Sequence, residues 1–109
     1  MPRAVLPTHR PSVTVEAEWQ GHPIIVSVGL DPATASPREV FANTPSGGAL
    51  QTSLADACVV ISIALQHGVP AADLGKSLAR EPGWHNGSQI TAPASHVGAI
   101  MDAVLGVVK

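Results

Sequence analysis

The stretch that most constrains the fold of this chain is SLADACVVISIALQHGVP, residues 53–70. Ser62 is the only residue that interrupts the apolar run from Ala57 to Leu65, so the segment is typical of a helix that is apolar almost all round. The run is too short to span a bilayer and therefore needs cover from protein. Either the rest of the chain packs on both sides of this helix, or part of the helix is left for a partner.

The helix is expected to run from about Ala49 to His67. One face carries apolar residues at helical spacing: Leu50, Leu54, Ala57, Cys58, Ile61, Ala64 and Leu65. After His67, Gly68 can adopt the left-handed conformation that ends many helices, and Pro70 prevents the helix from continuing.

Three strands are expected before this helix. Residues 12–20 and 24–30 alternate apolar and polar side chains, with a turn at 21–23, and residues 38–43 form a shorter third strand. Short connections between such strands favour a three-stranded antiparallel meander with one buried face. The proline-rich residues 1–11 are typical of an extended arm.

Two further helices are expected after the long one. Residues 71–80 carry Leu74 and Leu78 on one side, residues 81–93 are expected to form a loop, and a last helix begins near Ala94 or Ser95. Its apolar stripe consists of Val97, Ile100, Met101, Val104, Leu105 and Val108. The predicted fold is therefore α+β: a meander followed by three helices, with the long central helix packed on the sheet, in a single domain spanning 12–109.

Two accounts explain how the central helix is covered. The sheet can cover one side while the second and third helices cover the other, or Val59, Val60 and Ile63 can pack against another subunit. Only 13% of the residues are charged, which favours self-association. A symmetric homodimer is the simplest assembly, and a higher homo-oligomer is the alternative. The exposed part of the last helix around Val104 and Val108 is a second candidate interface.

Composition disfavours several classes of function. A net charge of −2 provides no basic stripe for a phosphate backbone, so no nucleic-acid partner is expected. The single cysteine cannot form an intrachain disulfide, and the N-terminus lacks the apolar core of a signal peptide. We therefore expect a cytoplasmic protein without a membrane partner.

The sequence contains no recognisable catalytic or metal-binding motif. Its five histidines, His9, His22, His67, His85 and His96, are not at metal-ligand spacing. Cys58 lies on the predicted inner face of the long helix, where a thiol acts as a small apolar group. No catalytic residue, metal or cofactor is predicted.

One local feature offers a route to ligand binding. The loop before the long helix contains Thr44, Ser46, Gly47 and Gly48, and the glycines would let its backbone approach an anion at the start of that helix. The competing interpretation is an ordinary loop in which Ser46 caps the helix, since no P-loop lysine follows.

Several stretches of the chain together resemble a known family. They are VTVEAEW, the strand PREVF, the SGG loop, ISIALQHGVP and the closing helix GAIMDAVL. They are similar to the TSCPD domain, a small module near the C-terminus of cobalamin-dependent ribonucleotide reductases that also occurs as a free-standing protein. The Thr-Ser-Cys-Pro-Asp signature that names the domain is absent here, and the only cysteine lies inside the long helix.

The resemblance implies a link to ribonucleoside-diphosphate reductase, an oxidoreductase. The reaction of that family needs a thiyl-radical cysteine, a further cysteine pair and a large barrel, whereas this chain has one cysteine and 109 residues. We therefore expect a non-catalytic module that self-associates or docks on a reductase-like partner. The alternative is a protein that binds a nucleotide or another small anion at the 44–48 loop.

Overall fold

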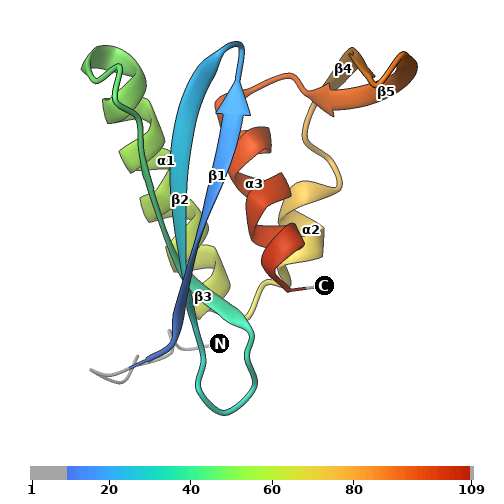
Figure 1. The fold of residues 1–109 in the computed structure, drawn as a ribbon. Coiled ribbons are helices and arrows are strands. Elements are labelled where there is room, and N and C mark those ends of the chain that lie inside the picture. The colour runs from blue at the N-terminus through green and yellow to red at the C-terminus, as the bar shows by residue number, and fades with distance from the viewer. Residues whose placement is uncertain (1–9, 109) are drawn as a thin grey trace.

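Two sheets and three helices make up residues 10–108, the part of the chain that the computed structural model describes (Figure 1). The elements are β1 (Ser12–Trp19), β2 (His22–Leu30), β3 (Pro37–Asn43), α1 (Gly48–Gln66), α2 (Ala71–Gly75), β4 (Arg80–His85), β5 (Ser88–Pro93) and α3 (His96–Val107). The predicted α+β architecture with an N-terminal meander is confirmed.

The first sheet is antiparallel, with the strand order β1-β2-β3. Its register places Val15 opposite Val26, and Val28 opposite Val40, so the apolar residues of all three strands share one face. The turn between β1 and β2 lies one residue earlier than expected, at Gln20 and Gly21, because both adopt the positive φ angles of 49° and 80° that a tight hairpin needs.

Residues 1–9 of the expected N-terminal arm lie outside the described residues. The described end of that arm is attached to the sheet. The Leu30 N–H donates to the Pro11 carbonyl at 2.8 Å, and the Arg10 guanidinium pairs with the Glu39 carboxylate. Arg10 and Pro11 therefore continue the line of β1 along β2.

The core lies between the apolar face of this sheet, α1 and α3. In Figure 1, α1 lies beside β3 and α3 lies beside β1. The fully buried side chains come from all these elements: Ile24, Val26, Val28, Val40, Leu54, Leu65, Ile100, Met101 and Val104. The predicted inner faces of both helices are thus confirmed.

The second side of α1 is not covered by the later helices, contrary to the first account of its packing. Contacts between α1 and α3 are few, and α2 packs on α3 instead. Val59 and Val60 are consequently 56% and 68% exposed, and Ile63 is 39% exposed. Because α3 occupies the sheet next to β1, it lies too far from α1 to cover that side.

Ser62, the residue that interrupts the apolar run, bonds to the outer edge of β3. Its hydroxyl accepts the Val40 N–H at 2.9 Å and lies 3.3 Å from the Val40 carbonyl, to which it donates. Both groups lie on the side of β3 that faces away from β2. A helix side chain therefore takes the place of a neighbouring strand at this position.

Two glutamines of α1 extend this interaction along the strand. The Gln66 amide donates to the Arg38 carbonyl at 3.1 Å. The Gln51 amide nitrogen donates to the Ala42 carbonyl at 3.3 Å, and its oxygen accepts the Thr44 N–H at 2.8 Å. One polar stripe of α1 thereby bonds to the outward carbonyls of β3 and to the Val40 N–H.

Residues 81–93 form a hairpin instead of the expected loop. Strands β4 and β5 pair from Arg80 opposite Pro93 to His85 opposite Ser88, and Asn86 and Gly87 form the turn with φ angles of 52° and 79°. Asn-Gly is the preferred pair for such a turn, and this signal was available in the sequence.

Helix α2 is shorter than expected and ends at Gly75. A Cβ atom at Gly75 would lie 3.0 Å from the Leu105 side chain, so the glycine allows α2 to approach α3 closely. After α2, Arg80 donates to both Asp102 carboxylate oxygens at 2.9 Å, which fixes the start of the hairpin to α3.

Replacing Ser62 should destabilise the fold through the edge of β3. In Ser62→Ala, the Val40 N–H and carbonyl lose their partner in a buried position, at an expected cost of about 1–3 kcal/mol. Ser53→Ala, at an exposed position on the same helix, should change stability by less than about 0.5 kcal/mol. Urea unfolding followed by circular dichroism measures both, and equal stability of the two variants would contradict this role.

Candidate functional site

The loop between β3 and α1 does not have the arrangement expected of a capped helix. The N-cap residue of α1 is Gly47, no side chain of the described residues caps the helix, and its first turn contains no acidic residue. Ser46 is exposed and lies 3.2 Å from His22 Nδ1 instead. The interpretation of Ser46 as the cap is therefore wrong, because this hydroxyl is hydrogen-bonded across to the start of β2.

The four predicted ligand-binding residues do not contribute equally to this loop. Thr44 is 7% exposed, and its hydroxyl accepts the Ser46 N–H at 3.3 Å, so it supports the loop from inside. Ser46 and Gly48 are exposed, and Gly47 is half-buried. The surface available to a ligand thus consists of the latter three residues and the start of α1.

An aromatic cluster next to this loop could not be found from linear spacing. Trp19 stacks on His22 with ring centroids 6.3 Å apart, and it meets the edge of His96 at 5.6 Å. The β1–β2 turn brings Trp19 and His22 together, and α3 begins at His96. Within the described part of the chain, the buried Trp19 Nε1 has no hydrogen-bond partner.

A groove of about 610 Å³ runs between β3 and α1. Phe41 and Val59, which are 55% and 56% exposed, and Ile63 form its apolar wall. Ser62 and Gln66 contribute the polar groups that already bond to β3. We call this surface the α1–β3 groove, and it includes part of the apolar side of α1 predicted from sequence.

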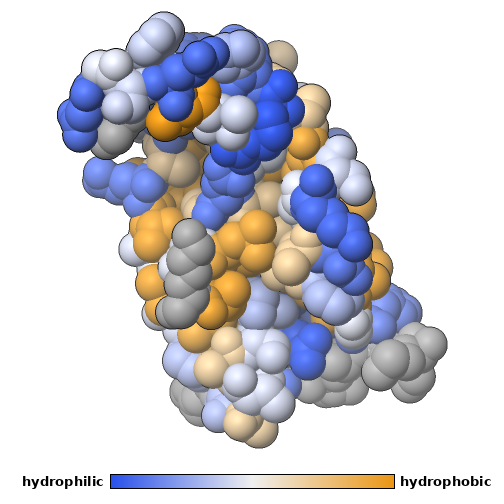
Figure 2. Space-filling view, turned by 90° about the vertical axis from the view of Figure 1, so that its right-hand side faces the viewer, coloured by the Kyte–Doolittle hydropathy of each residue, from blue (hydrophilic) through white to orange (hydrophobic). Residues whose placement is uncertain are grey.

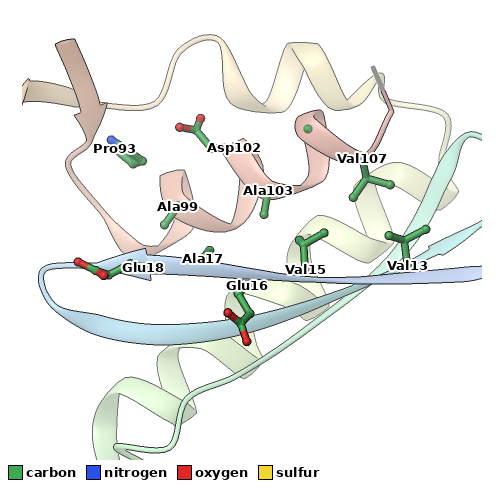
Figure 3. Close-up of a pocket in the computed structure, with 11 residues that line it drawn as sticks. Val13, Val15, Glu16, Ala17, Glu18, Pro93, Ala99, Asp102, Ala103 and Val107 are labelled. Atoms are coloured by element: carbon green, nitrogen blue, oxygen red, sulfur yellow. The ribbon is translucent and has the colours of Figure 1, made fainter. Parts of the chain in front are cut away.

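A second groove, of about 620 Å³, lies between β1 and α3 (Figure 3). Val13 and Val15 of β1 point toward α3, where Ala103 and Val107 face them, whereas Glu16 points to the opposite side of the strand. We call this surface the β1–α3 groove. It did not emerge from sequence, because its two walls are more than seventy residues apart in the chain.

The second interface expected from sequence is corrected in part. Val104 is fully buried, because it faces the sheet together with Ile100, whereas Val108 is 42% exposed. Figure 2 shows the side of the molecule on which α2 and α3 lie. Hydrophobic residues gather there below the mostly hydrophilic β4–β5 hairpin.

Cys58 lies in the core and is not poised for reaction. Its side chain is 3% exposed, and burial raises the pKa of the Cys58 thiol from 9.0 to about 11. The neutral thiol is therefore the form present at physiological pH. Among residues 10–108, no group of three or more histidine, cysteine, aspartate or glutamate side chains is arranged to hold a metal ion.

Length and composition alone would allow α1 to cross a membrane. This differs from the expectation based on the shorter apolar run, because the helix extends over 19 residues. Here α1 contacts β3 along its length and bonds to it through Gln51, Ser62 and Gln66. The absence of a membrane partner stays a prediction.

The fold and its surfaces define a small α+β module with two exposed grooves, whose single thiol is buried. The family model of the TSCPD domain matches residues 2–108, essentially the whole chain, and the protein belongs to this family. Neither the curated proteins nor the solved structures include a significant match.

Cys58 should react slowly with iodoacetamide in the native protein. Burial and the raised pKa of this thiol both keep the thiolate concentration low at pH 8, so labelling should accelerate strongly in 6 M guanidinium chloride. Because the folded pKa lies above the unfolded one, the contribution of the neutral thiol to stability should be complete below pH 9 and decline between pH 9 and about 11. Mass spectrometry measures the labelled fraction of Cys58 after increasing reaction times. Equal labelling rates in native and denatured protein would contradict the protection of this thiol.

Proposed function

We propose that this TSCPD protein is a non-catalytic interaction module of nucleotide metabolism in the cytoplasm. It docks on a reductase-like protein through the α1–β3 groove and also associates with itself. The observation that carries the docking part is the apolar wall of Phe41, Val59 and Ile63, left exposed on the longest helix and its neighbouring strand.

The hydrogen bonding of β3 favours one kind of occupant for this groove. Along the outer edge of β3, the Val40 N–H and the carbonyls of Arg38, Val40 and Ala42 are already bonded to Gln51, Ser62 and Gln66. A partner strand would find all three of these carbonyls and the Val40 N–H already occupied. We therefore favour an apolar helix of the reductase-like partner, which binds by packing side chains against Phe41 and Val59.

The single cysteine supports a role without catalysis. Ribonucleotide reduction in the related enzymes needs several cysteines, and Cys58 is buried with a raised pKa. The family resemblance then provides the class of partner, since the TSCPD domain also occurs as part of cobalamin-dependent reductases.

A charge placed in the groove should weaken docking. Val59→Asp puts a carboxylate into the apolar wall and should weaken binding to the cobalamin-dependent reductase of the same genome by tenfold or more. Ser53→Asp introduces the same charge elsewhere on α1 and should bind like wild type. Isothermal titration calorimetry with both folded variants measures the difference. Equal affinities, or no binding by wild type, would overturn the docking proposal.

The alternative function is binding of a nucleotide or another small anion at Ser46, Gly47 and Gly48. It is favoured by the start of α1, which has neither a side-chain cap nor an acidic residue, and by His22, which lies at hydrogen-bond distance from Ser46. Free backbone N–H groups at a helix start attract anions, and an imidazole N–H can donate a further hydrogen bond to an anion.

A ligand at this loop should raise the melting temperature. ATP, a deoxynucleoside triphosphate or inorganic phosphate at 5 mM should shift it by several degrees if the dissociation constant is well below that concentration. His22→Gln and Ser46→Ala should reduce the shift, whereas Thr52→Ala should not. Gly47 and Gly48 are poor sites for this test because their φ angles of 62° and 63° would strain a larger residue. No shift with any of these anions would rule out the alternative.

A further inference from the structure

We infer that the open edge of β1 pairs with β1 of a second copy of this chain, antiparallel and about a two-fold axis at Thr14. The two sheets would then form one continuous sheet, with the β1–α3 grooves facing each other. This inference rests on the self-association part of the proposed function and specifies its surface. It is independent of docking at the α1–β3 groove.

The first step is that the two edges of the three-stranded sheet differ in how far they are covered. The edge of β3 is covered by α1, whereas within residues 10–108 the only strand that pairs with β1 is β2. The bond from the Leu30 N–H to the Pro11 carbonyl shows that Pro11 faces β2, so the next residues of β1 alternate inward and outward from there. The residues whose N–H and carbonyl groups point to the open side are Ser12, Thr14, Glu16 and Glu18.

The second step is the composition of the surface next to this edge. Val13 is 37% exposed, and Val15 lies beside it at the base of the β1–α3 groove (Figure 3). On the α3 wall of the groove, the small residues Ala99, Ala103 and Gly106 lie beside Val107 and Asp102, whose carboxylate is paired with Arg80. A Cβ atom at Gly106 would meet nothing within 4 Å. The β1 strand of a second copy could therefore pair with unpaired backbone groups, and the α3 helix of that copy could pack near open apolar surface.

The third step is the charge pattern, which selects a second copy and its register. An axis at Thr14 places Ser12 opposite Glu16 of the second copy, and Arg10 opposite its Glu18. Each glutamate then lies opposite a neutral or a cationic residue and not opposite another carboxylate, although the Arg10 guanidinium itself lies over Gly29 of β2, beside Glu39. Thr14 of one copy pairs with Thr14 of the second copy through their outward N–H and carbonyl groups.

Other axis positions fit less well. An axis at Glu16 would place two glutamates directly opposite each other, which is unfavourable. An axis at Val15 leaves Arg10 opposite Gln20, and an axis at Val13 leaves Glu18 opposite a residue beyond the paired, described strand. The axis at Thr14 pairs residues 10–18 with residues 18–10 of the second copy, and no glutamate then lies opposite another carboxylate.

The first experiment compares two substitutions of Thr14 by light scattering after gel filtration. Wild type should have about twice the chain mass of 11.1 kDa. Thr14→Pro removes the outward N–H but no bond to β2, so it should yield a folded monomer. Thr14→Val also loses the contact between the Thr14 and Ser27 hydroxyls, yet it retains the N–H and should remain a dimer. Circular dichroism confirms that both variants are folded.

The second experiment determines the register by disulfide formation in a Cys58→Ala background. With the axis at Thr14, Val13 lies opposite Val15 of the second copy in a non-hydrogen-bonded pair, with Cα atoms about 4.5 Å apart, a distance that a disulfide can bridge. A mixture of Val13→Cys and Val15→Cys chains should therefore crosslink under mild oxidation, whereas neither variant should crosslink alone. A homodimer of Val13→Cys or of Val15→Cys would move the axis to that residue and overturn the register.

The outcomes separate this inference from the proposed function. A dimer that persists in folded Thr14→Pro overturns the β1 interface but leaves self-association in place. A wild-type monomer at tens of micromolar overturns both and leaves docking at the α1–β3 groove unaffected. If the inference holds, Val59→Asp should remain a dimer, and Thr14→Pro should still bind the reductase-like partner.

Discussion

The hydrogen bonds from α1 to the outer edge of β3 determine how the rest of this protein is arranged. Ser62 bonds to both backbone groups of Val40, and Gln51 and Gln66 satisfy the strand at its two ends. These bonds hold α1 beside the strand, so α3 packs next to β1 and the far side of α1 remains exposed. A polar stripe on an apolar helix thereby decides which surfaces are buried and which are available.

The main elements could be predicted from local patterns, because each pattern has one dominant physical cause. The alternation in β1 and β2 reflects one buried sheet face, and the helix end at Gly68 and Pro70 reflects backbone geometry. The β4–β5 hairpin was missed because Arg80–His85 contains Pro82 and no apolar alternation, so only Asn86-Gly87 indicated it. Its strands lie largely on the surface, where burial does not enforce a pattern.

The surfaces were less predictable, since each joins segments that are distant in sequence. The sequence indicated that Val59 and Val60 lie off the inner stripe, but it could not show that Phe41 of β3 completes the wall. The interaction of His22 with Ser46 depends on the sheet register, and the contact of Trp19 with His96 depends on where α3 begins. Val104 was misjudged because an apolar stripe does not reveal which of its residues face the sheet.

Covering one edge of a sheet also limits how far strands can add to it. A three-stranded sheet with two open edges could accept a copy on each side and extend into a fibre. In this chain, the amide and hydroxyl groups of α1 occupy the outward carbonyls of Arg38, Val40 and Ala42 and the N–H of Val40. If two copies pair through β1, growth by edge pairing would stop there, because the polar residues of an otherwise apolar helix would block the addition of further copies at β3.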